Sequence, residues 1–514
     1  MAAAAPSTQA WWRRPAIWLL VIFAAGIPLW LPAVPPLTDF PGHMGRYAVQ
    51  LDGGQSADLA QFYHFQWQWL GNLGVDLIVQ AIGPFLGVEA ASKLSAIAIA
   101  MLTTAGFLAV AQEVHGRLPP TVFFALPLAW SYPFLWGFVN FALSMALAFL
   151  AFAVWLRLGR LGRTRLRCGL FAILSLVLWT AHIYGWAALC ILAASAELVR
   201  VGLVSGQGWR AFWPACLRCL CLTPPMILMV LNFRGGGAGG QPLARLWFNL
   251  DMKARWVESI LRDRWEVFDK ASLLLLGLVL LAALVHWARD RRLPSGAHLI
   301  LAAALFAALF AILPHALLGS AYADMRLAPY ALATALLAIG PSVPCAAGVA
   351  ALAMLFFGIR TAGTTVSMIA YDRAYHTELQ AVTHLPRGAR VAALVGKPCA
   401  PGWRVHRMDH LPSLALVRRH AFVNDQWQAA GAQLISVRYA AAGAFRADPS
   451  QFVVEPRCER RERKAFAKAI AEIPRTAFDY VWVIQQPAAQ ADLTGLVPVW
   501  RTGRSALYRI VRTQ

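Results

Sequence analysis

The chain has 514 residues, of which 59% are hydrophobic and only 14% are charged. A soluble protein normally carries about a quarter charged residues, so this composition excludes an ordinary soluble globular protein and predicts a membrane protein. The formal net charge of +21 favours anionic headgroups or lipid phosphates as partners. Nucleic acid, the other common partner of basic proteins, is not expected at an external site.

The first apolar run covers residues 16–34, close to the roughly 20 residues that a membrane-spanning helix needs. Arg13 and Arg14 precede the run, as in a signal peptide, but Pro35 and Pro36 spoil a small-residue cleavage site. We therefore expect an uncleaved signal anchor with a cytoplasmic N-terminus.

Further apolar runs bring the expected total to about eleven transmembrane helices. They cover residues 92–112, 118–134, 137–156, 169–182, 186–204, 212–232, 271–288, 297–318, 328–344 and 345–362. The intervening run 72–88 is short and contains Asp76 and Pro84, so we interpret it as an interfacial or re-entrant element.

Arginine placement orients these helices, because cytoplasmic loops carry an excess of Lys and Arg. The arginine-bearing loops 157–167, 204–210 and 289–292 are therefore expected inside. With the N-terminus also inside, the C-terminus is expected outside, on the periplasmic face of a bacterial inner membrane.

The tail from residue 363 has a different pattern. Its apolar runs shorten to strand length, as in "ARVAALVG" (389–396) and "FDYVWVIQQ" (478–486), with a charged helical stretch at 459–473 among them. This mixture predicts a soluble α/β domain. The expected fold class is thus mainly α, a polytopic transmembrane helical bundle with a C-terminal soluble α/β domain. The expected boundaries are 1–362 for the bundle, with outer loops 35–91 and 233–270, and 363–514 for the periplasmic domain.

Two groups of cysteines allow different interpretations. Cys399 and Cys458 are the only cysteines of the tail, and an exported compartment permits a disulfide between them, although both thiols could equally stay free. The metal-like spacing of Cys216, Cys219 and Cys221 has no accompanying histidine, so buried small residues are the better interpretation.

The outer loops hold most of the chain's unusual polar residues. The candidate catalytic residues are Asp39 and His43, and the candidate substrate-binding residues are Arg46, His64, His182, Asp324, Arg326, Arg245 and Arg255. Simpler roles remain open. Asp39 could serve only as the cap of the helix that begins near Pro41. Asp324 and Arg326 could form a juxtamembrane ion pair or act as snorkelling anchors, and each lone histidine could be structural.

This arrangement resembles the GT-C superfamily of integral-membrane glycosyltransferases. The segment "TDFPGHMGRYAVQL" is similar to a D-x-P-x-H variant of that family's first outer loop, and short outer breaks such as "GFVNF" and an exported α/β tail accompany it. The resemblance implies an inverting transfer of a sugar from a polyprenyl-phosphate donor to a cell-envelope glycan or lipid acceptor, with Asp39 as base. The stretch "LTDFPG" lacks the second adjacent acid found in other members.

Glycosyl transfer from a lipid phosphate needs a base for the acceptor hydroxyl and positive charge at the departing phosphate. Arg326 and the arginines of 245–262 are candidates for that charge. No cofactor is expected; Asp39 with His43 could hold a divalent metal, but two ligands are too few to predict one. The alternatives are a lipid or glycan transporter or flippase, and a non-catalytic envelope-assembly protein.

Overall fold

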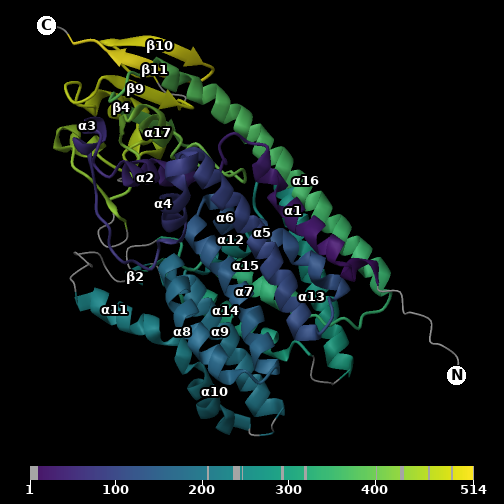
Figure 1. Cartoon of the computed structure of the whole chain (residues 1–514). Coiled ribbons are helices and arrows are strands. Elements are labelled where there is room, and N and C mark those ends of the chain that lie inside the picture. The colour runs from purple at the N-terminus through teal and green to yellow at the C-terminus, as the bar shows by residue number, and fades with distance from the viewer. Residues whose placement is uncertain are drawn as a thin grey trace, which may run out of the picture.

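The computed structural model describes residues 10–204, 206, 208–234, 244–245, 247–290, 295–317, 321–400, 402–428, 433–460, 463–487 and 490–512. Its helices form an elongated bundle, and a β-sheet from the C-terminal residues lies across one end of that bundle (Figure 1). Buried apolar side chains of both parts belong to one continuous hydrophobic core. The sheet is therefore packed onto the bundle rather than tethered to it.

The bundle is built from long helices with shorter ones between them. They are α1 (Pro15–Trp30), α5 (Val88–His115), α6 (Tyr132–Trp136), α7 (Val139–Arg160), α8 (Thr164–Ala181), α9 (Ile183–Val199), α10 (Phe212–Cys219), α11 (Pro224–Arg234), α12 (Leu250–Glu258), α13 (Glu266–Asp290), α14 (Ala297–Ile312), α15 (Ala328–Leu337) and α16 (Ala346–Leu379). Two short strands, β2 (Ala244–Arg245) and β3 (Ala316–Leu317), pair beside them.

Six of the described helices are long and apolar enough to cross a membrane, namely α5, α7, α8, α9, α13 and α16. A seventh span results if α10 and α11, which meet at a bend of 68°, together form one broken span. The chain therefore has the helices of a membrane-embedded protein, but the expected total of about eleven spans is not confirmed. The apolar helices α1, α14 and α15 are shorter than the other six.

One expected span, 118–134, is not a single helix. Two short 3-10 helices, Pro120–Phe124 and Leu126–Trp130, occupy most of it. Prolines at 119, 120 and 127 explain this, because each lacks the backbone N–H that a continuous helix needs.

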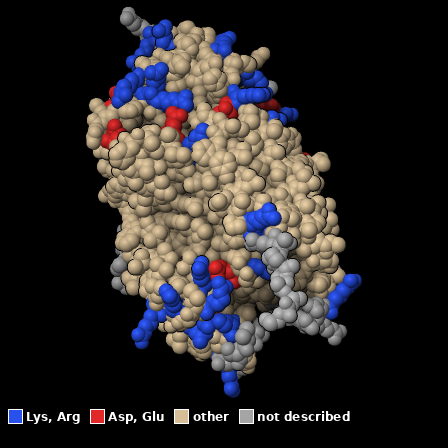
Figure 2. All heavy atoms as spheres, turned by 45° about the vertical axis from the view of Figure 1, so that its right-hand side comes forward, with Lys and Arg blue, Asp and Glu red and all other residues tan. Residues whose placement is uncertain are grey.

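Charged side chains gather toward the two ends of the molecule on the face in Figure 2, with a broad uncharged band between them. Large apolar side chains are exposed on the long helices, among them Phe23 of α1, Leu278 of α13 and Leu355 of α16. Such side chains are stable outward only against lipid or another apolar surface. The band therefore has the character of a membrane-facing surface.

The C-terminal sheet has the strand order β10-β11-β9-β4-β7-β8, with β5 also paired to β4. Its strands are β4 (Arg390–Gly396), β5 (Phe422–Val423), β7 (Phe452–Val454), β8 (Lys464–Ala465), β9 (Tyr480–Ile484), β10 (Leu496–Thr502) and β11 (Ser505–Ile510), with helices α17 (Ser413–Arg419) and α18 (Phe466–Glu472) between them. Strands β5, β7 and β9 run parallel to β4, whereas β10 and β11 form an antiparallel hairpin. The central strand β4 is almost wholly buried, which explains its continuous apolar sequence.

Helix α16 connects the bundle to the sheet. It runs along the side of the bundle and ends beside the strands (Figure 1). The expected boundary at residue 363 falls inside this helix, and the first strand of the sheet begins only at Arg390. One continuous helix therefore passes from the bundle into the C-terminal region.

The segment after α1 lies between the bundle and the sheet. It forms α2 (Phe40–Asp52), α3 (Ala57–Ala60), β1 (Tyr63–Phe65) and α4 (Gly74–Leu86), and β1 pairs with β6 (Ile435–Val437) of the C-terminal region. A Cβ at Gly42 would lie 2.7 Å from the ring of Trp427, and one at Gly45 would lie 2.6 Å from Gln426 Nε2. The two glycines of "FPGHMGRY" therefore permit the close packing of α2 against the C-terminal region.

A buried arginine also fastens the sheet to the bundle. The Arg407 side chain is fully buried; it forms an ion pair with Asp263 and donates to the carbonyl of Pro36 at 2.8 Å. Tyr375 of α16 donates its hydroxyl to the Arg407 carbonyl. Because a buried charge is costly unless paired, these contacts make the packing of the tail specific.

Candidate functional site

Asp39 lies where the segment after α1 meets the bundle. Its backbone N–H donates to the carbonyl of Trp136 at 2.8 Å. Gly137 has a φ of +103°, and a Cβ there would lie 2.8 Å from the Asp39 backbone nitrogen. Glycine alone tolerates both the conformation and the contact. The break "GFVNF" between α6 and α7 therefore sets the position of Asp39.

The carboxyl group of Asp39 faces the C-terminal region. Asp39 is the N-cap residue of α2, but its side chain makes no capping hydrogen bond. Its Oδ1 lies 3.8 Å from Nε2 of His410, and its side chain is only 16% exposed. Burial, reinforced by Asp409 and Asp448 and opposed by His410, raises the pKa of Asp39 to about 7. This proton affinity suits a general base at neutral pH.

His410 lies between two carboxylates from distant parts of the chain. Its Nε2 is 3.8 Å from Oδ1 of Asp39 and 3.8 Å from Oδ1 of Asp448. Its Nδ1 lies 2.9 Å from the backbone carbonyl oxygen of Asp425, and Gln451 donates to Asp448 at 2.8 Å. We refer to Asp39, His410 and Asp448 as the acid–imidazole cluster.

The sheet topology explains how this cluster forms. Strand β5 pairs with the start of β4 and β7 with its end, so the two short strands follow one another along the same side of β4. Asp425 follows β5 and Asp448 precedes β7. The connection after β4 places His410 between Asp425 and Asp448. The start of α2, with Asp39, packs against His410 from the bundle side.

A second buried group of charges lies at the carboxyl ends of β4 and β9, the edge where parallel sheets usually bind ligands. Lys397, which follows β4, donates to Asp409, and His406 contacts Asp409 through Nδ1 and Gln485 through Nε2. Lys397 and His406 hold the pKa of Asp409 well below its usual value in spite of its burial. Asp409 is therefore a fixed anion near Asp39.

A disulfide braces the connection that carries these residues. Cys399 and Cys458 are joined, with their Cα atoms 5.4 Å apart. The bridge links the chain just after β4 to the chain just after β7. Of the two possibilities that the sequence allows, the structure therefore contains the disulfide.

Trp427 lies beside two histidines of the site. Its ring centroid is 4.9 Å from that of His43 and 4.3 Å from that of His410. Burial, together with the charges of Arg46 and His410, lowers the pKa of His43 well below its usual value. His43 is therefore a neutral ring that packs beside the cluster.

Arg326 and His182 approach the site from the bundle. The Arg326 guanidinium lies 4.4 Å from the ring centroid of Phe138 and 3.3 Å from Nε2 of His182. Phe138 comes two residues after Trp136, whose backbone carbonyl accepts the hydrogen bond from the Asp39 backbone N–H. The ring of Tyr322, whose φ is +60°, lies 5.0 Å from that of Trp136. A cation and a group of aromatic rings therefore lie around the break between α6 and α7 that contacts the Asp39 backbone.

Asp324 and Arg46 each form an ion pair with a residue outside the acid–imidazole cluster. Asp324 forms an ion pair with Lys253 at 2.7 Å, and not the ion pair with Arg326 that the sequence suggested. Arg46 forms a buried ion pair with Asp76 at 2.8 Å, and Asn140 donates to the same carboxylate at 2.8 Å. Both charged groups therefore have ion-pair partners outside the acid–imidazole cluster.

The remaining candidates are more peripheral. His64 lies in β1, opposite Ser436 of β6. Arg255 is exposed on α12. Arg245 lies in β2, but its side chain is outside the described part of the structure. The structure thus brings together Asp39, His43, His182 and Arg326 of the nine candidates.

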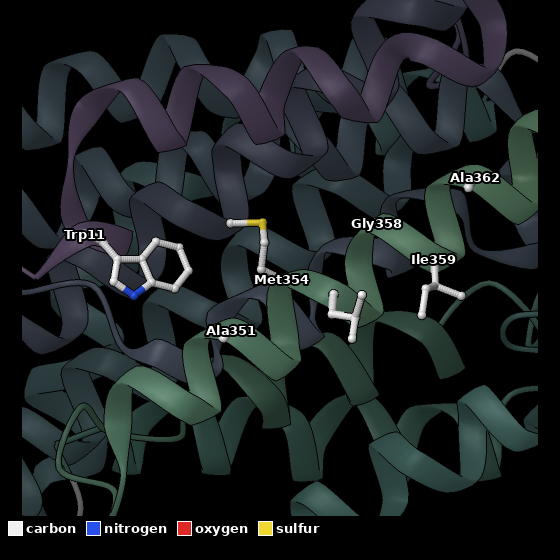
Figure 3. Close-up of a pocket in the computed structure, with 7 residues that line it drawn as sticks. Trp11, Ala351, Met354, Gly358, Ile359 and Ala362 are labelled. Carbon is white, nitrogen blue, oxygen red and sulfur yellow. The ribbon is translucent and has the colours of Figure 1, made fainter.

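Two surface cavities in the described part of the structure are lined by none of the cluster residues. An apolar groove of about 570 Å³ runs along α16, where Met354 extends toward Trp11 (Figure 3). It contains no titratable side chain, so its character is that of a lipid-facing groove. A cavity of about 400 Å³ lies at the sheet end of α16, between Val34, Tyr375 and Arg418.

Among the described residues, no group of three or more His, Cys, Asp or Glu side chains has an arrangement suited to a metal ion. In comparisons with known proteins, no family model and no curated protein matches the chain. The geometry of the acid–imidazole cluster is therefore the basis for inferring function.

Sequence reasoning missed His410 and Asp448. Both lie in the tail, in "RMDHLP" and "ADPS", more than three hundred positions after Asp39. The only signal is the density of charged and imidazole side chains at 404–410 within an otherwise apolar chain. Nothing local indicates that this stretch packs onto α2.

Proposed function

We propose that this protein is a membrane glycosyltransferase of the GT-C type, in which Asp39 is the catalytic base. It moves a sugar from a polyprenyl-phosphate donor to a cell-envelope acceptor at the periplasmic surface. The observation that supports this most is the carboxyl group of Asp39, which is largely shielded from solvent, makes no capping hydrogen bond and lies 3.8 Å from Nε2 of His410. Burial raises the pKa of this group to about 7.

The chemistry follows from the groups around Asp39. The ionised carboxylate accepts the proton of the acceptor hydroxyl as its oxygen bonds to the anomeric carbon. At the same time the bond from that carbon to the phosphate oxygen breaks, and the phosphate leaves as an anion. Arg326, which packs on Phe138 at the break that contacts the Asp39 backbone, provides positive charge for the phosphate. A single displacement of this kind inverts the anomeric configuration.

The architecture supports a lipid-linked donor. The cluster lies at the sheet end of the bundle, whereas the uncharged band provides surroundings for a polyprenyl tail (Figure 2). In the orientation that the arginine-rich loops favour, the sheet end faces the periplasm and the C-terminal α/β region forms a periplasmic domain. The disulfide between Cys399 and Cys458 agrees with an exported compartment.

The test is transfer by purified protein in nanodiscs from a polyprenyl-phosphate sugar, compared between the wild type and Asp39→Asn. Asparagine keeps the size and the capping ability of aspartate but cannot accept the proton. We expect transfer to fall about 100-fold or more, with insertion and folding retained. The matched control is Asp58→Asn, a partly exposed acid of α3 that forms an ion pair with Arg387 and lies outside the acid–imidazole cluster, so this change should leave transfer near normal. Near-normal transfer by Asp39→Asn would rule out Asp39 as base.

A lipid or glycan transporter is the second candidate. Asp269 of α13 and Arg360 of α16 form a buried ion pair at 2.7 Å within apolar helices, and ionisable residues in such helices often mark transport pathways. A transporter would move a labelled lipid-linked sugar across a vesicle membrane without forming a glycosidic product. The purified protein can be reconstituted in vesicles for this assay. If it moves the labelled lipid across the membrane and forms no glycosidic product, the result favours a transporter.

A further inference from the structure

In the described part of the structure, the Asp39 carboxyl group forms an ion-pair contact with His410 of the C-terminal region, at 3.8 Å. We propose that His410 is an imidazolium that keeps Asp39 ionised, so that the C-terminal region sets the strength of the base. This inference rests on the proposed function of Asp39, and it adds a positioning residue to it.

The hydrogen bonds of His410 assign its two nitrogens. Nδ1 lies 2.9 Å from the backbone carbonyl oxygen of Asp425, which can only accept, so Nδ1 carries a hydrogen. Nε2 is therefore the nitrogen that titrates, and it faces Oδ1 of both Asp39 and Asp448 at 3.8 Å. A neutral Nε2 would present a lone pair to two acids, whereas a protonated Nε2 attracts both.

The surroundings of His410 favour its charged form. The acidic groups that act on it come from α2 (Asp39), the ends of β5 and β7 (Asp425 and Asp448) and its own connection (Asp409). They hold the pKa of His410 above its usual value in spite of burial.

Two basic side chains, His43 and Lys397, also lie in the surroundings of His410. His43 of α2 is held neutral, and Lys397 after β4 is bound to Asp409, so neither cancels the acids around His410. The Trp427 ring, 4.3 Å from the imidazole, also favours a cation beside it.

This role of His410 does not change where the proton goes in the proposed reaction. The acceptor proton goes to the Asp39 carboxylate, and His410 keeps its own proton throughout. Before the reaction, the positive charge of His410 opposes protonation of Asp39. The fraction of Asp39 that is ionised at neutral pH therefore depends on the contact between α2 and the connection after β4.

The first experiment measures kcat/KM for transfer against pH in wild type, His410→Gln and the control His384→Gln, an exposed histidine far from α2 in the chain. Removing the cation should raise the pKa of Asp39, so the acid limb of the profile should move to higher pH by about 1 unit or more. Activity of His410→Gln should recover at alkaline pH. The profile of His384→Gln should match the wild type.

A loss of activity in His410→Gln that is equal at every pH, with no movement of the acid limb, would show a merely structural role and overturn the inference. Absence of transfer in the wild type would instead contradict the proposed function. The two failures are therefore distinguishable.

The second experiment does not depend on activity. Nitrogen NMR of histidine-labelled protein in nanodiscs, with His410→Gln used to assign the signal, should show an imidazolium at pH 7 that titrates at lower pH in Asp448→Asn. A neutral imidazole at pH 6 in the wild type would overturn the inference whatever the transfer assay shows.

Discussion

At the scale of single residues, Asp39 combines features that seldom occur together in a structural acid. It begins a helix without capping it, it is largely buried, and its nearest charged neighbour at 3.8 Å belongs to a distant part of the chain. A carboxyl group of this kind destabilises the folded state when it ionises, because burial penalises the charged form. Function is the common reason for keeping such a group.

This reasoning predicts how stability depends on pH. The folded pKa of Asp39, about 7, is above its unfolded value, so the protonated acid favours folding at low pH. That contribution is complete below about pH 4 and is lost as the pH rises through 7. Asp39→Asn, which stays neutral, should therefore melt at a higher temperature than the wild type at pH 8, with the difference shrinking toward pH 4.

Thermal unfolding of the two proteins in detergent, followed by intrinsic fluorescence, measures this difference. The control is Asp58→Asn, a change at a partly exposed acid outside the cluster, and it should not show a rise in melting temperature at pH 8 that shrinks toward pH 4. A lower melting temperature for Asp39→Asn at every pH would mean that the carboxylate is required for packing.

At the scale of elements, α2 is held from two sides. Gly42 and Gly45 allow the C-terminal region to pack on one side. On the other side, Arg46 pairs with Asp76 at the start of α4, and Asn140 of α7 binds the same carboxylate. Asp39 keeps its direction because its helix is fixed between these contacts.

The ion pair of Arg46 and Asp76 should behave as a unit. Each side chain is almost fully buried, so removing one partner leaves an unpaired buried charge. Arg46→Met or Asp76→Leu alone should destabilise the protein by about 3–5 kcal/mol, whereas the double variant should recover much of that loss.

Chemical or thermal unfolding of the two single variants and the double variant tests this coupling. The sequence also suggested Arg46 as a substrate-binding residue, and the same set tests that role. If Arg46→Met keeps its stability but loses transfer, Arg46 binds substrate instead of supporting α2.

At the scale of the whole molecule, the ends of the bundle differ in chemistry. The acid–imidazole cluster, Arg326 and the disulfide lie at the sheet end. The arginine-rich connection between α7 and α8 lies at the far ends of those helices from Asn140 and His182. A membrane protein with this asymmetry should insert with the arginine-rich end in the cytoplasm.

Fusions to a reporter that is active only in the periplasm test this orientation. A fusion after residue 512 should be active, and a fusion after residue 162, between α7 and α8, should be inactive. A cytoplasmic reporter should give the opposite pattern. Activity only after residue 162 would place the cluster in the cytoplasm and contradict the proposed function.

Much of the secondary structure could be predicted from local sequence alone. The apolar run at 92–112 falls within α5, and all but the first two residues of 137–156 belong to α7. The strand-length runs at 389–396 and 478–486 contain β4 and β9. Length, hydropathy and periodicity are local properties, so the chain reveals them without its fold. The count of spans was less predictable, because an apolar run such as 118–134 is buried in the bundle without forming one helix.

The sequence by itself indicated apolar helices of the kind that cross a membrane, strands in the tail, and an acid, Asp39, shortly after the first apolar run. Only the tertiary structure decided which groups surround that carboxyl. His410 and Asp448 reach it because β5 and β7 follow one another beside β4 and because two glycines let α2 approach. Contacts between positions so far apart depend on packing and topology, and no local pattern in one sequence records them.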